Sequence, residues 1–237
     1  MKKKIFAKNN EGVFLSKMIP ILYEDECCIV FQKPAGLLVI PTPKKESQTL
    51  VSIVNHQYRT EQSYKLHPAH RLDKETSGAI IFGKGKKNQQ RIMELFQKGE
   101  VCKKYIAIVH GKLKNKKGVL KSYISTLDEK KFSKKVKGKF AETHYLVKRQ
   151  YDSFAVVEVR TMTGRTNQIR IHFSDKGHPL LGDRKYSVSK NFKIKFRRTA
   201  LHAAYLEFTG FEKNVIIQSK MPMDMEDFLN NYERRSF

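Results

Sequence analysis

The sequence predicts an α+β fold, in which helices pack on a largely antiparallel sheet. Short apolar runs rich in β-branched residues follow one another with few helical stretches between them, unlike the regular strand–helix alternation of a parallel sheet. The chain has 237 residues, of which 40% are hydrophobic, and this is enough for a buried core. No internal repeat and no linker rich in Pro, Gly or Ser divides the chain.

Two strands and a short helix are predicted in the N-terminal third. Residues 27–32 (CCIVFQ) form an apolar, β-branched run that ends at the turn sequence of residues 33–36 (KPAG). A short helix is expected after Thr49, because the apolar residues of 50–54 follow it. Residues 79–83 (AIIFG) are typical of a buried strand.

The longest helix is predicted over residues 86–98. Its apolar residues Ile92, Leu95 and Phe96 share one face, and Gly99 is suited to end it. The remaining predicted elements are strands at 104–109, 119–125, 143–148, 154–161, 201–208 and 214–218, a helix at 166–174, and a last helix from about residue 222 that packs through Met223, Phe228 and Leu229.

The net charge is strongly positive. Lys and Arg number 47 against 23 Asp and Glu, which gives a formal charge of +24 and a pI near 9.9. Such an imbalance predicts a polyanionic partner, with nucleic acid as the first candidate and an anionic membrane surface as the second. Because the sequence has no long basic amphipathic helix of the interfacial membrane type, nucleic acid is favoured.

Two segments hold most of this charge. Residues 112–139 contain eleven lysines against two acids, and residues 184–198 contain seven basic residues and no acid. A single lysine-rich run indicates a solvated surface as readily as it indicates a nucleic-acid-binding surface. Two runs that both include aromatic residues favour binding along a nucleic-acid backbone. These aromatic residues are Tyr123, Phe132, Tyr186, Phe192 and Phe196.

The cysteines and the apolar runs exclude several classes of protein. Cys27, Cys28 and Cys102 have no CxxC spacing, so neither a zinc site of the usual kind nor a disulfide framework is expected. No apolar run reaches the ~18–20 residues of a membrane helix. The basic N-terminus lacks the apolar stretch of a signal peptide. A reducing, cytoplasmic location without membrane attachment is therefore predicted.

Residues 67–78 (HPAHRLDKETSG) place Asp73 between Arg71 and Lys74, just before a buried strand. Nearby cations are expected to keep this carboxylate ionised, and an ionised, positioned carboxylate serves as a nucleophile or a base. The commoner role of a single Asp in such a stretch is to accept backbone hydrogen bonds in a turn or to cap a helix. The stretch alone leaves both interpretations open.

A second stretch, residues 163–186 (TGRTNQIRIHFSDKGHPLLGDRKY), brings Arg165 and Arg170 into one short polar segment. Arginine is suited to a bidentate grip on a carboxylate or a phosphate. The alternative is a solvated polar helix. The glycine turns at 177–179 and 182–183 are interpreted as structural.

Together, these stretches resemble the RluA-type pseudouridine synthases. Residues 70–78 (HRLDKETSG) match the central motif of that family, whose HRLDxxTSG pattern is highly specific. The other similar segments follow in the family's order and are 33–39 (KPAGLLV), 103–113 (KKYIAIVHGKL), 163–172 (TGRTNQIRIH), 177–186 (GHPLLGDRKY) and 201–208 (LHAAYLEF). The resemblance covers about residues 20–220.

The resemblance implies that the protein isomerises uridine in structured ribosomal or transfer RNA: the uracil leaves the ribose at N1 and rejoins it at C5. It implies a mixed, mostly antiparallel central sheet with flanking helices and loops, and an active site in a cleft. Neither a metal nor an organic cofactor is expected, and the protein is expected to be a monomer. Residues 19–237 would form the catalytic domain and residues 1–18 an N-terminal arm or extension, without the S4-like domain of many relatives.

The resemblance also implies a role for four residues. Asp73 matches the essential aspartate, and Arg170 matches the arginine that pairs with it. Tyr105 matches a tyrosine that stacks on the target base and is a candidate for removing the C5 proton, although a hydroxyl with a pKa near ~10 is a poor base without help. Arg71 matches the arginine that fills the space left by the flipped nucleotide. Asp73 would attack C1′ or remove the 2′ proton to give a glycal, and both routes stay open.

A larger set of residues is predicted to contact RNA. Asn167 belongs to this set but stands where the family often has His, so different hydrogen bonding is expected there. The set consists of Arg71, Lys33, Arg165, Asn167, Gln168, Lys130, Lys131, Lys134, Lys135, Arg197 and Arg198. Two other classes of function are weighed: a non-catalytic RNA-binding or RNA-folding protein on the same scaffold, and a metal-dependent nuclease, for which the sequence lacks the carboxylate cluster.

Overall fold

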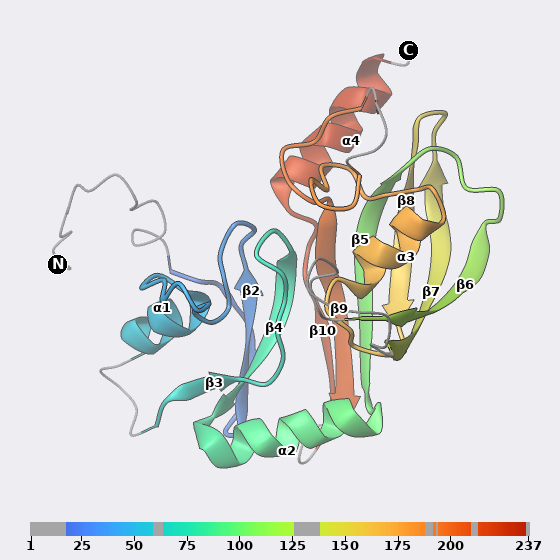
Figure 1. Cartoon of the computed structure of the whole chain (residues 1–237). Coiled ribbons are helices and arrows are strands. Elements are labelled where there is room, and N and C mark those ends of the chain that lie inside the picture. Colours follow the sequence, from blue (N-terminus) through green and yellow to red (C-terminus); the bar gives the residue numbers. More distant parts are fainter. Residues whose placement is uncertain are drawn as a thin grey trace, which may run out of the picture.

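The computed structural model describes residues 18–58, 64–125, 138–187, 192, 194–209 and 213–235. Figure 1 shows the arrangement of the helices and strands in this part of the chain. The strands are β1 (Ile21–Glu24), β2 (Cys28–Lys33), β3 (Leu66–Pro68), β4 (Ser77–Lys84), β5 (Val101–His110), β6 (Lys117–Ile124), β7 (Lys139–Gln150), β8 (Phe154–Thr161), β9 (Leu201–Thr209) and β10 (Asn214–Gln218). The helices are α1 (Leu50–Gln57), α2 (Gly85–Lys98), α3 (Gln168–Asp175) and α4 (Met223–Arg235). None of these helices is long and apolar enough to cross a membrane.

These strands form one sheet in the order β1-β2-β4-β9-β5-β8-β7-β6, to which β3 is added beside β4 and β10 beside β9. Only the β4–β9 pairing is parallel among the described strands, and the other pairings are antiparallel. The predicted α+β fold with a mixed, mostly antiparallel sheet is therefore confirmed.

The short β4–β9 junction depends on Gly78. Its φ is +117°, and a Cβ atom at this position would lie 2.2 Å from the carbonyl oxygen of Ala203. Glycine alone avoids both the strain and the clash. The junction joins an N-terminal half (β1–β4) to a C-terminal half (β5–β10), and the two halves stand side by side (Figure 1).

Each half of the sheet has helices on its faces. In the N-terminal half, α1 packs near Phe31 and Phe82, and α2 covers the opposite face through Ile92. In the C-terminal half, α3 packs one face through Phe173. α4 covers one end of the opposite face through Met225. The rest of that opposite face, on β6, β7 and β8, is not covered by any described helix.

Each strand and helix that the sequence predicts is present, but two strands were not predictable. β1 is a half-exposed edge strand of four residues, and β3 has only three, so neither has a clear apolar pattern. In α4, Met223 is 75% exposed and the prediction that it packs inward is wrong. It is the first residue of the helix, and Met225 is buried instead. The predicted arm, residues 1–18, lies outside the described residues apart from Met18.

Candidate active site

A cleft of about 1430 Å³ opens where the two halves of the sheet meet. The N-terminal half contributes loop 69–76, which connects β3 to β4. The C-terminal half contributes Tyr105 on β5 and the segment 160–170, which runs from β8 into α3. The three residues that the resemblance implies as catalytic, Asp73, Tyr105 and Arg170, therefore line one cleft although they are far apart in the sequence.

Asp73 lies in the turn just before β4. Its carbonyl oxygen accepts a hydrogen bond from the backbone N–H of Thr76 at 3.1 Å, and its side chain is 34% exposed on the cleft wall. Within the described part of the chain, no backbone amide donates to its carboxylate. The carboxylate therefore does not cap a turn or a helix and faces the cleft beside a cation, which is the arrangement that a reacting group requires.

Lys33 braces the loop that carries Asp73 from inside the protein. Its side chain is fully buried, and its Nζ donates to the carbonyl oxygens of Pro34 at 2.8 Å and Lys74 at 3.0 Å. Burial lowers the pKa of Lys33 to about 7. The prediction that Lys33 contacts RNA is therefore wrong, because its amine is enclosed and bonded to backbone carbonyls.

Arg198 holds the same loop from the other side. It is 7% exposed, and its Nη1 donates to the carbonyl oxygen of Glu75 at 3.1 Å. Its Nε and Nη2 bind both carboxylate oxygens of Asp224 in α4, at 2.6 and 2.9 Å. The prediction that Arg198 contacts RNA is also wrong, because its guanidinium connects α4 to the loop of Asp73 within the protein.

Arg170 lies between two carboxylates. Its Nη1 is 3.5 Å from Oδ2 of Asp73, whereas its Nε and Nη2 donate to both oxygens of Asp183 at 2.7 and 2.9 Å. The Nη1 atom also donates to Oδ1 of Asn167 at 2.7 Å. The predicted ion pair of Arg170 with Asp73 is present, but the closer, bidentate partner of this guanidinium is Asp183.

Electrostatics keep Arg170 and Asp183 charged. Burial opposes the charge of Arg170, but the hydrogen bond and charge of Asp183, followed by the charge of Asp73, outweigh it and raise the pKa of the guanidinium. Burial would raise the pKa of Asp183, but Arg170 and the backbone N–H groups of Lys185 and Tyr186 lower it. Asp183 therefore fixes Arg170, and Arg170 presents its remaining edge to Asp73.

The N-terminus of α3 explains how Arg170 is aimed. Asn167 has a φ of 55°, in the left-handed region that Asn tolerates better than most residues, and its side chain holds Arg170. Gln168 is 4% exposed, and the prediction that it contacts RNA is wrong because its amide is fully used inside the protein. Its partners are Thr163 Oγ1, the backbone N–H of Arg165, the carbonyl oxygen of Glu142 and Thr143 Oγ1.

Tyr105 lines the cleft from β5 and packs against the hydrophobic cores of both halves of the sheet. Burial, and after it the charge of Asp73, raises the pKa of the Tyr105 hydroxyl well above its ordinary value. The hydroxyl therefore keeps its proton near neutral pH. This environment suits a ring that stacks on a base, and it does not suit the proton-removing role that the resemblance also allows.

The other predicted RNA contacts are distributed over three environments. Arg71 is exposed in the cleft, and Arg165 lines the cleft wall. Arg197 is exposed but is not among the residues that line the cleft. Four lysines, Lys130, Lys131, Lys134 and Lys135, lie outside the described residues.

The sequence interpretation missed Asp183, the bidentate partner of Arg170. The Gly182-Asp183 pair looked like an ordinary turn, and the turn is real: the Asp183 carboxylate accepts the backbone N–H groups of Lys185 and Tyr186. The usable signal was an acid in the matched segment 177–186, which is the next matched segment after that of Arg170. In the described part of the chain, no cluster of three or more His, Cys, Asp or Glu side chains has a geometry that would hold a metal ion.

Comparisons with known proteins identify the family. Residues 28–175 match the family described as RNA pseudouridylate synthase. The chain is 31% identical to "Uncharacterized RNA pseudouridine synthase YhcT" of Bacillus subtilis, over 96% of this chain and 81% of the relative. It is 33% identical to "Ribosomal large subunit pseudouridine synthase D" of Nitrosomonas europaea, over 93% of this chain and 67% of the relative.

A solved structure supports the same assignment. "Human RNA Pseudouridylate Synthase Domain Containing 4" superposes with a TM-score of 0.70 and 27% identity, over 85% of this chain and 88% of that one. The chain therefore belongs to the RNA pseudouridine synthases of the RluA type, enzymes that isomerise uridine in RNA.

Proposed function

We propose that this enzyme converts one or more uridines of structured RNA to pseudouridine with Asp73 as the catalytic carboxylate. The observation that carries the proposal is the position of Asp73, which faces the cleft with Arg170 as its cation, 3.5 Å away. Ribosomal RNA is the first candidate substrate, because a relative that the chain matches along most of its length is named for the large ribosomal subunit. Transfer RNA is the second.

The substrate has to leave its stack before it reaches Asp73. A base inside a stem is extruded at a cost of a few kcal/mol, which stacking on other groups partly offsets. Tyr105 offers its ring to the extruded uracil from the cleft wall, and the exposed guanidinium of Arg71 is placed to fill the gap in the stem. This arrangement supports a binding role for Arg71 and a positioning role for Tyr105.

Cleavage of the glycosidic bond builds positive charge at C1′, which a facing carboxylate stabilises. Asp73 either attacks C1′ or removes the 2′ proton to form a glycal, and in both routes it acts as an anion. Arg170 would orient this carboxylate and leave it accessible to the substrate. Asp183 and Asn167 fix the guanidinium by hydrogen bonds for this role. Tyr105, whose raised pKa keeps it protonated, is assigned no role as a base. After the C1′–C5 bond forms, the C5 proton passes to Asp73, which is again an anion once it has released C1′ or returned the 2′ proton, and N1 takes up a proton from water.

The test is restoration of pseudouridine in RNA from a strain that lacks the gene. Purified wild-type protein should restore at least one site in total RNA, and Asp73→Asn should restore none while binding the same RNA. Asp152→Asn is a matched control, because the Asp152 side chain is 92% exposed and pairs only with a surface lysine, Lys112. Absence of any restored site, or equal restoration by Asp73→Asn, would contradict the proposal.

A non-catalytic RNA-binding role is the second candidate function, since the net charge of +24 serves binding as well as turnover. The Asp73→Asn variant separates the two. If it rescues every growth defect of the deletion strain, RNA binding rather than modification is the function that the cell requires.

We further propose that residues 19–237 act as one catalytic domain, as a monomer in the cytoplasm and without a cofactor.

A further inference from the structure

One face of the C-terminal half of the sheet carries exposed apolar and basic side chains, and no described helix or strand covers it. We call it the open face: the side of β6, β7 and β8 opposite α3. The strand register puts Tyr123 opposite Phe140 and Lys117 opposite Leu146 on this face. Half of the exposed large apolar side chains of the described chain gather here, namely Val119 (50% exposed), Tyr123 (76%), Phe140 (40%), Leu146 (42%) and Met162 (47%).

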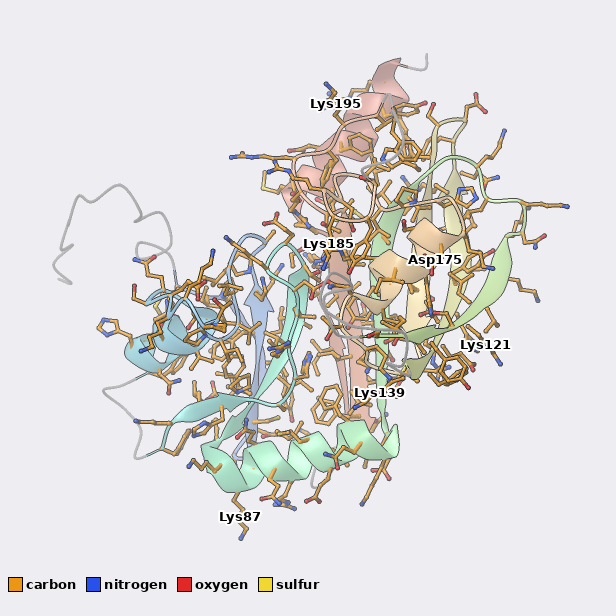
Figure 2. The ribbon with its side chains drawn as sticks, in the orientation of Figure 1. Lys87, Lys121, Lys139, Asp175, Lys185 and Lys195 are labelled. Atoms are coloured by element: carbon orange, nitrogen blue, oxygen red, sulfur yellow. The ribbon has the colours of Figure 1, made fainter. Side chains whose placement is uncertain are left out.

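The strongest feature of the open face is an exposed aromatic pair. The rings of Tyr123 and Phe140 meet edge to face, with centroids 5.8 Å apart. Lys121 lies two residues before Tyr123 on the same side of β6. Figure 2 shows Lys121 on the right of the view, far from α4 at the top. A ring surface beside cations is the combination that stacks bases and binds phosphates.

Two acids lie on the open face, Glu158 opposite Leu146 and Glu142 two residues after Phe140. Glu142, the acid nearer the aromatic pair, does not oppose an anionic ligand. Glu142 lies opposite Lys121, with 3.2 Å between Oε2 and Nζ, and its other oxygen is 2.6 Å from Nε2 of His144. These contacts lower the pKa of Glu142, first through the hydrogen bond to His144 and then through Lys121. Its charge is therefore compensated within the face, and Arg160 adds an exposed cation on β8.

The open face is continuous with the active-site cleft. Arg165, which lines the cleft, donates from Nε to the carbonyl oxygen of Phe140 at 2.9 Å. Thr163, another cleft residue, accepts a hydrogen bond from the backbone N–H of Glu142 at 3.0 Å. Met162 is exposed and lines the cleft as well. The edge of the cleft at residues 162–165 therefore adjoins β7 at Phe140, the residue whose ring belongs to the aromatic pair.

We propose that the open face binds unpaired nucleotides that flank the target uridine, with a base stacked on Tyr123. This inference rests on the proposed function for the identity of the ligand. Strands that carry exposed aromatic rings and cations bind single-stranded RNA by stacking, which tolerates any base because every base has a π face. A second copy of the chain fits less well, because pairing two open faces would bring Lys117, Lys121 and Arg160 against like charges.

The test uses the absence of tryptophan from this chain. Tyr123→Trp places the sole indole on the open face, and Met223→Trp places it at an equally exposed position, 75% against 76%, on α4. Single-stranded oligouridylate should quench the emission of Tyr123→Trp and leave that of Met223→Trp unchanged. Because stacking is the contact, Tyr123→Ala should weaken binding of the oligonucleotide by about 5- to 100-fold, and Tyr123→Phe should bind as wild type does.

Three results would overturn the inference: no quenching at saturating RNA, equal quenching at both positions, or emission of Tyr123→Trp that changes with protein concentration before RNA is added. The last result would assign the face to a second copy. The binding readout requires no turnover, so the two proposals fail separately. Quenching without any restored pseudouridine would contradict only the proposed function, and restored pseudouridine without quenching would contradict only the open face.

Discussion

Two groups of basic residues surround the cleft, and burial separates their roles. Lys33, Arg170 and Arg198 are buried or nearly so, and each is bonded to acceptors of the protein itself. Arg71 and Arg160 are exposed, and both line the cleft. The buried group fixes Asp73 and its loop, whereas the exposed group is available to phosphates.

This difference shows that the net charge of +24 does not measure RNA binding alone. A cation contributes to salt-dependent RNA binding only when it neutralises a phosphate and releases a counterion. A cation enclosed by carbonyls and carboxylates contributes to stability and geometry instead. Substitutions in the buried group should therefore have the largest effects.

Asp183→Asn should have the largest effect. It removes the bidentate, buried partner of Arg170 and leaves a guanidinium partly uncompensated, which costs about 3–5 kcal/mol of unfolding free energy in comparable buried pairs. Loss of the aim of Arg170 should also lower turnover by about 100-fold, since a displacement of about 1 Å in an active site has that effect. Thermal unfolding and single-turnover pseudouridine formation measure the two effects.

The control for this variant is Asp175→Asn. Asp175 is exposed at the end of α3, the helix that carries Arg170, so it should leave both measurements unchanged. RNA affinity should stay the same in both variants. If Asp183→Asn lowers stability but keeps full turnover, Asp183 serves the fold only and does not position Arg170.

The difference between the two groups also marks what the sequence can predict. Asp73 was identifiable because its motif is local and specific, and most strands and helices were identifiable from apolar runs. Lys33 and Arg198 were assigned to RNA because a basic residue beside a motif looks the same whether it faces water or the protein. The burial of Lys33 depends on the pairing of β2 with β4, and that of Arg198 on the pairing of β4 with β9. A linear pattern does not contain that information.

Adjacent arginines offer the next test. Arg198→Met should cost about 2 kcal/mol of unfolding free energy, less than a fully buried pair, because its partner Asp224 is 45% exposed. Arg197→Met removes the same charge one residue away at an exposed position, so stability should change by less than about 0.5 kcal/mol. Chemical unfolding of the two variants measures this contrast.

In RNA binding, Arg197→Met should have a larger effect than Arg198→Met, the reverse of their order in stability. If Arg197 contacts a phosphate, Arg197→Met lowers the slope of log affinity against log salt by about 1, and Arg198→Met leaves the slope unchanged. A lower slope in Arg198→Met with unchanged stability would return Arg198 to the RNA-binding group.

The last expected effect is a pH dependence of stability that originates at Lys33. Burial lowers its pKa in the folded chain to about 7, whereas an unfolded chain has the ordinary lysine value near ~10.4. Between these two values the unfolded chain binds more protons at Lys33 than the folded chain does. This residue should therefore make the unfolding free energy rise with pH, by at most about 1.4 kcal/mol per pH unit. The stability that deprotonation of Lys33 contributes at high pH therefore decreases as the pH falls from about 10.4, and it is lost as the pH falls through the folded-state pKa of about 7.

Lys33→Met should remove this rise, although it also lowers stability at every pH by leaving the carbonyl oxygens of Pro34 and Lys74 without their donor. The informative quantity is thus the slope between pH 7 and 9, measured by chemical unfolding of wild type and variant. Lys74→Met provides the control, because Lys74 is exposed on the same loop and the slope should match that of wild type. Parallel curves for wild type and Lys33→Met would mean that the carbonyl cage keeps Lys33 charged throughout, and the buried group would then hold the loop of Asp73 by permanent charge.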